Sequence, residues 1–421
     1  MLRNWKLKLL ACAVLAGFAL APAGQASAQS GEPIKIGFSM SLTGPLSPNG
    51  KQALLGLQIW EEEVNQKGGL LGRPIKLVYY DDQSQSAPVP GIYTKLLDVD
   101  KVDLILGPYA TVPAAAAMPV AIQKNKMIIV LFGLGVNSEF NYKRFFAMIP
   151  SGPDPKPSFT TGFFEIAAAQ NPKPQTVAFI ASDLEFSRNA CDGAKTNAKK
   201  IGLRTVYDRA YPPSTTDFTP VIRGIMAANP DVVTVCSYPL DSVGIVRTVN
   251  ELNFKPKLIG GAMVGLQATP IKNQLGPLLN GWVNYETWVP DKKLYFEGTD
   301  AFFKKYQSRA AAAGVDPLGN YLGCWGYAYA QVLEQAVKGA KSLKDDDLAA
   351  YIHKNSFKTI HGDIKFGANG EWAKSGMLQV QYHGIKQGAG IETWRGMDYQ
   401  NVLTPPELKT GNVVYPFEKA R

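Results

Sequence analysis

Apolar residues follow two different spacings along most of the chain. The almost continuous apolar run Ile34–Met40 predicts a buried strand, and apolar steps of three and four residues across 50–67 predict a helix with one buried face. Further strands are expected at 75–80, 102–106 and 127–132, and further helices at 89–97 and 112–125. Buried strands that alternate with helices predict a parallel sheet covered on both faces.

The same alternation returns after a proline-rich segment at 150–157. Because prolines interrupt helices and cannot donate to a sheet, this segment predicts a boundary between two α/β units. The second unit is predicted to hold strands at 176–181, 204–211, 231–237 and 257–260, and helices at 187–201, 218–228 and 241–252.

The last third of the chain departs from this alternation. A strand at 278–288 is followed by three helices, at 295–313, 321–338 and 345–354, and then by strands at 364–366 and 377–382. Helices without intervening strands need an existing core to cover. We therefore expect these helices to pack on the first unit and the tail to complete the second.

The predicted fold class is α/β, with two doubly wound parallel-sheet lobes joined by three chain crossings. Lobe 1 is expected to comprise residues 29–150 plus 290–356, and lobe 2 residues 151–289 plus 357–421. Open parallel sheets bind ligands beyond the carboxyl ends of their strands, so the ligand cleft is expected between the lobes.

The first 28 residues have the composition of a secretory signal peptide. Residues 1–8 carry three basic side chains and no acid, residues 9–21 are almost wholly apolar, and Ala26-Ser27-Ala28 is a small-x-small cleavage site. A lipoprotein anchor at Cys12 is a weaker alternative, because only a few apolar residues would precede it.

Composition and charge exclude several classes of protein. With 46% hydrophobic and 19% charged residues in 421, the chain is too apolar to be disordered and long enough for two domains. Its net charge of 44 − 35 = +9 falls to 9 − 3 = +6 without the signal peptide, and no basic run remains to indicate a nucleic-acid partner.

At most one disulfide can form among the three cysteines that remain after the signal peptide, which are Cys191, Cys236 and Cys324.

Motifs for catalysis, metals and cofactors are missing from the sequence. The three histidines, His353, His361 and His383, match no metal-ligand spacing. The segment 44–51 has the wrong glycine spacing for a phosphate loop, and 133–138 lacks the third glycine of a dinucleotide fingerprint. The chain is therefore not expected to be an enzyme or to hold a cofactor.

Loops after the predicted strands carry several aromatic side chains. Tyr109, Phe132, Phe186 and Tyr238 all lie in such loops, together with hydroxyl groups and backbone N–H groups. A cleft with this lining suits a small, partly apolar or aromatic ligand that bears a carboxylate.

A series of short motifs resembles one known family over nearly the whole mature chain. The motifs are Ile36-Gly37-Phe38, Leu42-Thr43-Gly44-Pro45, Asn65-Gln66-Lys67-Gly68-Gly69, Leu71-Gly72-Arg73, Tyr80-Asp81-Asp82, Lys101-Val102-Asp103, Gly107-Pro108, Thr216-Asp217-Phe218-Thr219 and Asn229-Pro230-Asp231. In this order they resemble the type I periplasmic solute-binding proteins of the branched-chain amino acid class, which deliver ligands to ABC importers. The resemblance implies a periplasmic monomer that closes on a small-molecule ligand and then meets an inner-membrane ABC permease.

The resemblance also implies roles for individual residues. Thr111 stands where the family places a hydroxyl that binds the ligand carboxylate, and the backbone of Leu134 and Val136 lies on the loop that completes this anchor. Val136 replaces a threonine that contacts the ligand ammonium, and Ala262 replaces an acid that binds the same cation. Phe186 replaces a tyrosine.

These departures bear on the ligand. A buried ammonium without its acidic partner costs several kcal/mol, so the sequence favours a carboxylate without an amine, such as a hydroxybenzoate, a cinnamate or an aryl keto acid. Two alternatives remain: an amino acid or amide ligand of the same importer class, and a sensing module for a membrane receptor kinase.

Tyr321, Trp325 and Trp288 are expected to pack at the hinge. The candidate ligand-binding residues are Asn49, Tyr109, Thr111, Phe132, Leu134, Val136, Phe186, Arg188, Tyr238, Ala262 and Met263, with Arg188 placed to reach a second ligand oxygen.

Overall fold

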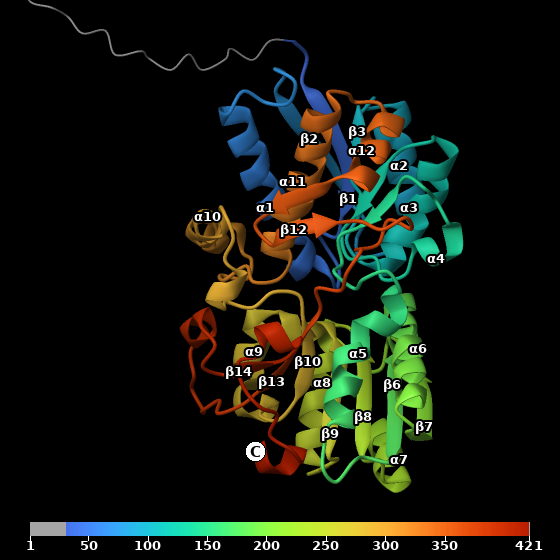
Figure 1. The fold of residues 1–421 in the computed structure, drawn as a ribbon, viewed down its shortest axis with the longest axis vertical. Helices are drawn as coiled ribbons and strands as arrows, with labels where there is room; N and C mark the ends of the chain where they lie inside the picture. The colour runs from blue at the N-terminus through green and yellow to red at the C-terminus, as the bar shows by residue number, and fades with distance from the viewer. Residues whose placement is uncertain (1–30, 421) are drawn as a thin grey trace, which may run out of the picture.

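The computed structural model describes residues 31–420, which form two lobes stacked along the long axis of the molecule (Figure 1). The predicted signal peptide at 1–28 and Cys12 lie outside the described residues. No helix between residues 31 and 420 is long and apolar enough to cross a membrane.

The upper lobe is built on a parallel sheet in the order β2-β1-β3-β4-β5. Strands β2, β1 and β3 form one ladder and β4 and β5 another, and the two are joined by a 2.7 Å hydrogen bond from the Gly107 N–H to the Ile129 carbonyl. The strands are β1 (Ile34–Met40), β2 (Ile75–Asp81), β3 (Leu104–Ile105), β4 (Ile128–Val130) and β5 (Phe145–Ala147). Their connections contain α1 (Ser47–Gln66), α2 (Val89–Asp98), α3 (Thr111–Gln123) and α4 (Asn137–Phe140).

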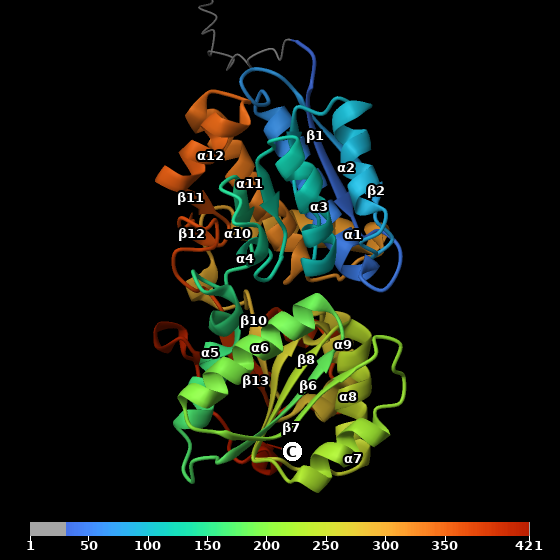
Figure 2. The ribbon, with the colours of Figure 1, turned by 90° about the vertical axis from the view of Figure 1, so that its right-hand side faces the viewer.

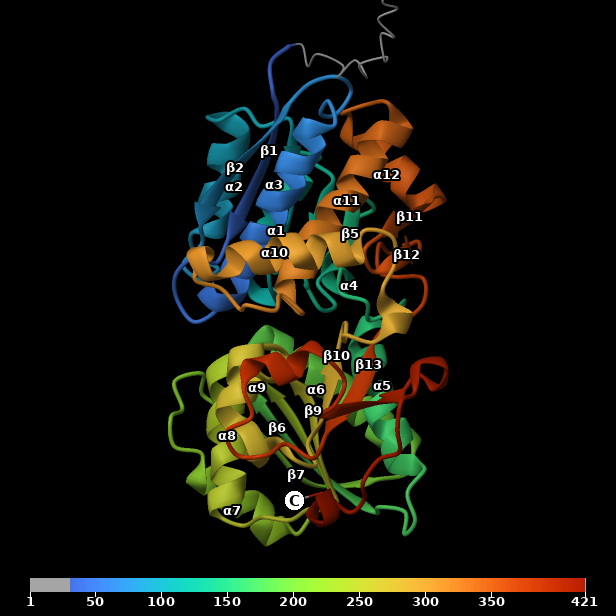
Figure 3. The same cartoon turned by 90° about the vertical axis from the view of Figure 1, so that its left-hand side faces the viewer.

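Three later helices return to the upper lobe, as predicted. These are α10 (Thr299–Ala313), α11 (Leu322–Ala340) and α12 (Asp345–Lys354). Helix α11 packs along α1, with α10 beside them (Figure 3). The α1–α11 contact requires glycine, because a Cβ at Gly326 would lie 2.4 Å from the Ala53 carbonyl oxygen.

The lower lobe repeats the same strand order in β7-β6-β8-β9-β10 and adds two antiparallel strands, β13 and β14, beyond β10. The strands are β6 (Thr176–Ser182), β7 (Arg204–Tyr211), β8 (Val232–Ser237), β9 (Leu258–Met263), β10 (Val283–Glu286), β13 (Leu378–Tyr382) and β14 (Gln400–Thr404). Helices α5 (Pro155–Ala168) and α6 (Glu185–Lys200) cover one face of the sheet, and α7 (Thr219–Ala228), α8 (Pro239–Glu251) and α9 (Thr269–Leu275) cover the other (Figure 2).

Two predicted elements differ from the structure. The proline-rich segment was expected to contain no helix, yet α5 begins at Pro155, because proline is tolerated in the first turn, where its missing N–H has no intrahelical partner. The strand expected at 278–288 is limited to β10, since residues 276–279 form a 3-10 turn before it.

The hairpin of β11 (Ser356–Thr359) and β12 (Gly362–Lys365) lies in the upper lobe, although residues after 357 were expected in the lower one (Figure 1). Phe366 at its end contacts Phe146, with ring centroids 5.3 Å apart, and Trp372 contacts Trp325 at 5.8 Å. These apolar contacts hold the chain on the upper core. We therefore place the third crossing at 373–377.

A disulfide joins two elements of the lower lobe. Cys191 of α6 is bonded to Cys236 of β8, and Cys324 is a buried free cysteine. The sequence predicted that one pair at most could form, and the structure identifies that pair.

Two titratable side chains of the upper lobe are buried without hydrogen-bond partners. Glu371 is 1% exposed, and burial raises the pKa of its carboxyl from the ordinary 4.5 to about 8. Burial acts in the opposite direction on His361, which stacks on Trp325, and lowers its pKa to about 3. Both side chains are therefore uncharged in the folded protein between these values.

We expect the wild type to lose stability as the pH rises, because of Glu371, and Glu371→Gln to abolish this pH dependence. The folded pKa of Glu371 lies above its unfolded value, so the folded state holds a proton that the unfolded state has released, and the free energy of unfolding falls by at most ~1.4 kcal/mol per pH unit. His361 has the opposite effect, which fades as the unfolded histidine loses its proton above pH 6.5 and which is the same in both proteins. Denaturant unfolding between pH 6.5 and 8 should therefore show a flatter profile for Glu371→Gln than for the wild type. The exposed Glu297→Gln is the matched control, and parallel profiles for all three proteins would contradict the prediction.

Candidate functional site

The carboxyl ends of the two sheets face each other, and their loops enclose a small cavity, which we call the inner chamber. Its free space is about 20 Å³, enough for about one water molecule. Both lobes and the second crossing contribute to its lining, which consists of Tyr109, Ala110, Thr111, Phe132, Ile149, Phe186, Tyr238, Val264, Tyr285 and Tyr321.

The amino-terminal end of α3 forms one wall of the chamber. The helix was expected to begin at residue 112, but Thr111 is its first residue, and Ala110 occupies the cap position with φ 75°. The Thr111 hydroxyl oxygen instead accepts a 3.1 Å hydrogen bond from the Leu134 N–H. The hydroxyl hydrogen therefore remains available for an acceptor in the chamber, beside the positive end of the helix dipole.

Tyrosine hydroxyls form a polar wall that spans both lobes. The Asn49 amide donates to the Tyr109 hydroxyl at 2.9 Å, and the Tyr321 hydroxyl is hydrogen-bonded to those of Tyr109 and Tyr285. Burial raises the pKa of Tyr109 to about 12 and also raises the pKa values of Tyr285 and Tyr321. These phenols are uncharged at neutral pH and act as hydrogen-bonding groups.

Aromatic rings make up the rest of the wall. Phe132, with φ 59°, packs its ring 5.5 Å from that of Tyr321. In the lower lobe the Phe186 ring lies 5.6 Å from Phe159 and 5.8 Å from Tyr238. Among the described residues, none that lines the chamber carries a charged side chain.

A hydrogen bond connects the two lobes next to the chamber. The side-chain amide of Asn189, on α6, donates to the Leu134 carbonyl at 3.0 Å, and both residues are buried. The Leu134 peptide group thus binds Thr111 on one side and the lower lobe on the other.

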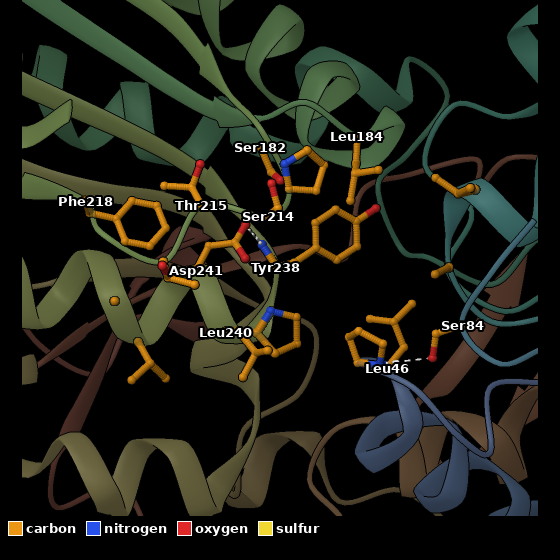
Figure 4. A pocket seen from close by; sticks show the side chains of 18 of the residues that line it. Leu46, Ser84, Ser182, Leu184, Ser214, Thr215, Phe218, Tyr238, Leu240 and Asp241 are labelled. Atoms are coloured by element: carbon orange, nitrogen blue, oxygen red, sulfur yellow. Dashed lines mark hydrogen bonds between the residues drawn. The ribbon is translucent and has the colours of Figure 1, made fainter. Parts of the chain in front are cut away.

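A larger cavity, which we call the outer cleft, opens from the inner chamber and has a volume of about 500 Å³ (Figure 4). The two cavities share Ala110 and Tyr238 in their linings. The remaining lining is mainly apolar and comes from both lobes: Pro45, Leu46, Ser84, Val112, Pro113, Ser182, Leu184, Pro213, Ser214, Thr215, Thr216, Phe218, Pro239, Leu240, Asp241, Val243, Gly244 and Arg247.

Five of the predicted ligand-binding residues line the inner chamber: Tyr109, Thr111, Phe132, Phe186 and Tyr238. Asn49 lies directly behind them and holds the Tyr109 hydroxyl. The structure thus brings these six predicted residues together from five separate segments of the chain.

The other predicted residues do not line the chamber. Leu134 and Val136 are buried and do not line it. Ala262 and Met263 are the last two residues of β9 and are also buried, and the next residue, Val264, which begins a 3-10 turn, lines the cavity instead. Arg188 is exposed and forms a 2.7 Å ion pair with Asp183, so it points away from the chamber.

Sequence analysis missed Tyr285 and assigned Tyr321 to hinge packing. Both lie at the second crossing, where the chain leaves β10 and returns to begin α11. A signal for Tyr321 was present, since it is the first residue of the helix predicted at 321–338 and so stands at a helix amino terminus, as Thr111 does. The sequence contains no pattern that would predict that Tyr285 or Tyr321 lies next to Tyr109 in the fold.

Other kinds of site are absent from the described part of the chain. Between residues 31 and 420, no three histidine, cysteine or acidic side chains gather in a way that could hold a metal ion.

Comparisons with known proteins agree with this architecture. A family model described as "Periplasmic binding protein" matches residues 33–389. Leu/Ile/Val-binding protein homolog 7 from Brucella abortus is 26% identical over 363 residues, which cover 83% of this chain and 89% of that protein.

Two solved structures share the fold at low sequence identity. A leucine-binding protein from Thermotoga maritima has a TM-score of 0.73 at 22% identity and covers 89% of this chain and all (100%) of its own. A solute-binding protein of an ABC transporter from R. palustris, in complex with 4-hydroxybenzoate, has a TM-score of 0.71 at 17% identity, covering 85% of this chain and 94% of its own.

We expect Asn189→Ala to loosen the contact between the lobes. The form in which the lobes touch loses about 0.5–1.5 kcal/mol of stabilisation when the hydrogen bond to the Leu134 carbonyl is lost. The population therefore shifts toward more open forms. Small-angle scattering of the ligand-free protein should therefore give a larger radius of gyration for Asn189→Ala than for the wild type. Arg188→Ala, one residue away and exposed, should leave the radius unchanged. Equal radii for all three proteins would show that this hydrogen bond does not hold the lobes together.

Proposed function

The chain belongs to the periplasmic binding protein family, and we propose that it binds a small carboxylate, preferably an aromatic one, and presents it to an ABC importer. The observation that carries this proposal is the make-up of the inner chamber, in which a helix amino terminus and neutral hydroxyls meet aromatic rings without any acidic side chain.

The start of α3 supplies the anchor for a carboxylate. Backbone N–H groups in the first turn of a helix have no intrahelical acceptor, and the helix dipole favours an anion at that end. The Thr111 hydroxyl hydrogen adds a donor at the same place, since its oxygen is already hydrogen-bonded to the Leu134 N–H. The neutral phenols of Tyr285 and Tyr321 can donate to further ligand oxygens without adding charge.

The absence of an acid in the lining argues against an α-amino acid. A buried ammonium needs a negative partner, and desolvating it without one costs several kcal/mol. Among the residues of the outer cleft, the carboxylate of Asp241 is already engaged, because it accepts hydrogen bonds from the Tyr211 hydroxyl at 3.0 Å and the Tyr238 N–H at 3.3 Å. An ammonium would have to compete for this acid.

The two solved structures named above differ in the ligands that their names give, one being a leucine-binding protein and the other a 4-hydroxybenzoate complex. Family and fold therefore favour neither ligand, and the lining of the inner chamber supports the aromatic carboxylate. Phe132, Phe186 and Tyr238 offer ring faces and edges that suit an aromatic body.

Transport follows from closure of the lobes around the ligand. The inner chamber has walls from both lobes, so a ligand held by Thr111 completes its contacts only when Phe186 and Tyr238 approach. Binding and closure are then one linked equilibrium, and the closed form is the one that the permease is expected to recognise. Capture takes place in the periplasm, and no chemical step is required of the protein.

A thermal-shift panel tests the ligand class. Benzoate, 4-hydroxybenzoate, cinnamate and phenylpyruvate are expected to raise the melting temperature, because a ligand that binds only the folded state stabilises it, whereas leucine, isoleucine and valine are expected to leave it unchanged. A rise with the amino acids alone would contradict the proposal and favour the amino acid alternative.

We expect Thr111→Ala to weaken binding of an aromatic carboxylate by about 1–3 kcal/mol, the contribution of a hydrogen bond to a charged group. Isothermal titration calorimetry with 4-hydroxybenzoate measures this loss. Thr94→Ala is a matched control, since Thr94 is exposed and hydrogen-bonded only within its own helix. Full affinity in Thr111→Ala would remove Thr111 from the carboxylate anchor.

A further inference from the structure

The outer cleft continues away from the inner chamber as a groove along α8. Tyr238 precedes this helix, and Asp241, Gly244 and Arg247 follow at intervals of three residues, so that they share one face. Arg247 is nine positions beyond Tyr238, about 13 Å along the helix axis. The groove is therefore longer than a single aromatic ring.

The opposite wall of the groove is the loop between β7 and α7. Residues 213–216 and Phe218 line the cavity from this side (Figure 4). Phe218 closely approaches α8, because a Cβ at Gly244 would lie 2.6 Å from its ring. The groove thus has an apolar floor made by Phe218 and Val243.

Arg247 brings a free positive charge to the far end of the groove. Its side chain is exposed, and among residues 31–420 it has no hydrogen bond or ion pair. The one acid that lines the groove, Asp241, is 8% exposed and bound to Tyr211 and the Tyr238 backbone, so it does not neutralise Arg247. A guanidinium without a partner matches a carboxylate in charge and in bidentate geometry.

We infer that the ligand is an elongated dicarboxylate. One carboxylate enters the inner chamber at Thr111, the apolar body passes Tyr238 into the outer cleft, and the second carboxylate is bound by Arg247. This inference rests on the proposed function, which supplies the first binding group at Thr111. It adds Arg247 as a second binding group, which a monocarboxylate with a single ring would not reach. The distance of about 13 Å along α8 from Tyr238 to Arg247 calls for an elongated body between the two carboxylates.

Calorimetry with two compounds that share a biphenyl group tests the role of Arg247. Biphenyl-4,4′-dicarboxylate and biphenyl-4-carboxylate differ only in the distal carboxylate. We expect the diacid to bind the wild type at least tenfold more tightly than the monoacid, and Arg247→Gln to remove this difference without changing the affinity for the monoacid. Arg223→Gln, an exposed arginine of α7 outside the cleft, should behave as the wild type.

The possible failures are distinguishable. If the two probes bind the wild type equally well, or if Arg247→Gln keeps the preference for the diacid, Arg247 is not an anchor and the inference is wrong. If benzoate or 4-hydroxybenzoate binds but neither biphenyl probe does, the groove does not accept an elongated body, and the inference fails while the proposed function stands. If no carboxylate binds at all, the proposed function fails together with the inference.

Discussion

The hydrogen-bonded hydroxyls of Tyr109, Tyr321 and Tyr285 join the lobes where the carboxyl ends of both sheets meet. Each sheet has the same strand order, so each presents a row of loops and helix amino termini to the other. Neither row encloses a cavity alone. The walls and the uncharged polar lining of the inner chamber both follow from this meeting of the carboxyl ends of two sheets.

Most of the fold could be predicted from local patterns. The strand bounds Ile34–Met40 and Arg204–Tyr211 agree with the structure. Strand β1 is a buried, almost continuous apolar run, whereas β7 is a mostly exposed strand at the edge of its sheet. The return of α10, α11 and α12 to the upper lobe was predictable from the physical need of helices without strands for a core. Proline misled the prediction at α5, since its effect depends on its position in the helix.

The site was harder to predict because its residues are brought together by tertiary packing. Tyr109 and Thr111 were found through the rule that ligands bind at strand ends, whereas Tyr285 and Tyr321 depend on how the second crossing folds back. An offset of one residue separates buried Met263 from Val264 in the cavity wall, since β9 ends at Met263 and the chain turns at Val264. The third crossing was misplaced because Phe366 and Trp372 belong to the upper core through contacts that no local pattern encodes.

A disulfide links the two elements that carry the lower-lobe wall of the inner chamber. Cys191 lies on α6, which carries Phe186 and Asn189, and Cys236 lies on β8, which leads to Tyr238. The aromatic wall of the lower lobe is thus covalently fastened to its sheet. Disulfides form and persist mainly in oxidising compartments, so this covalent link is missing in a reducing one. The lower-lobe wall of the inner chamber is therefore fixed to its sheet only where the surroundings are oxidising.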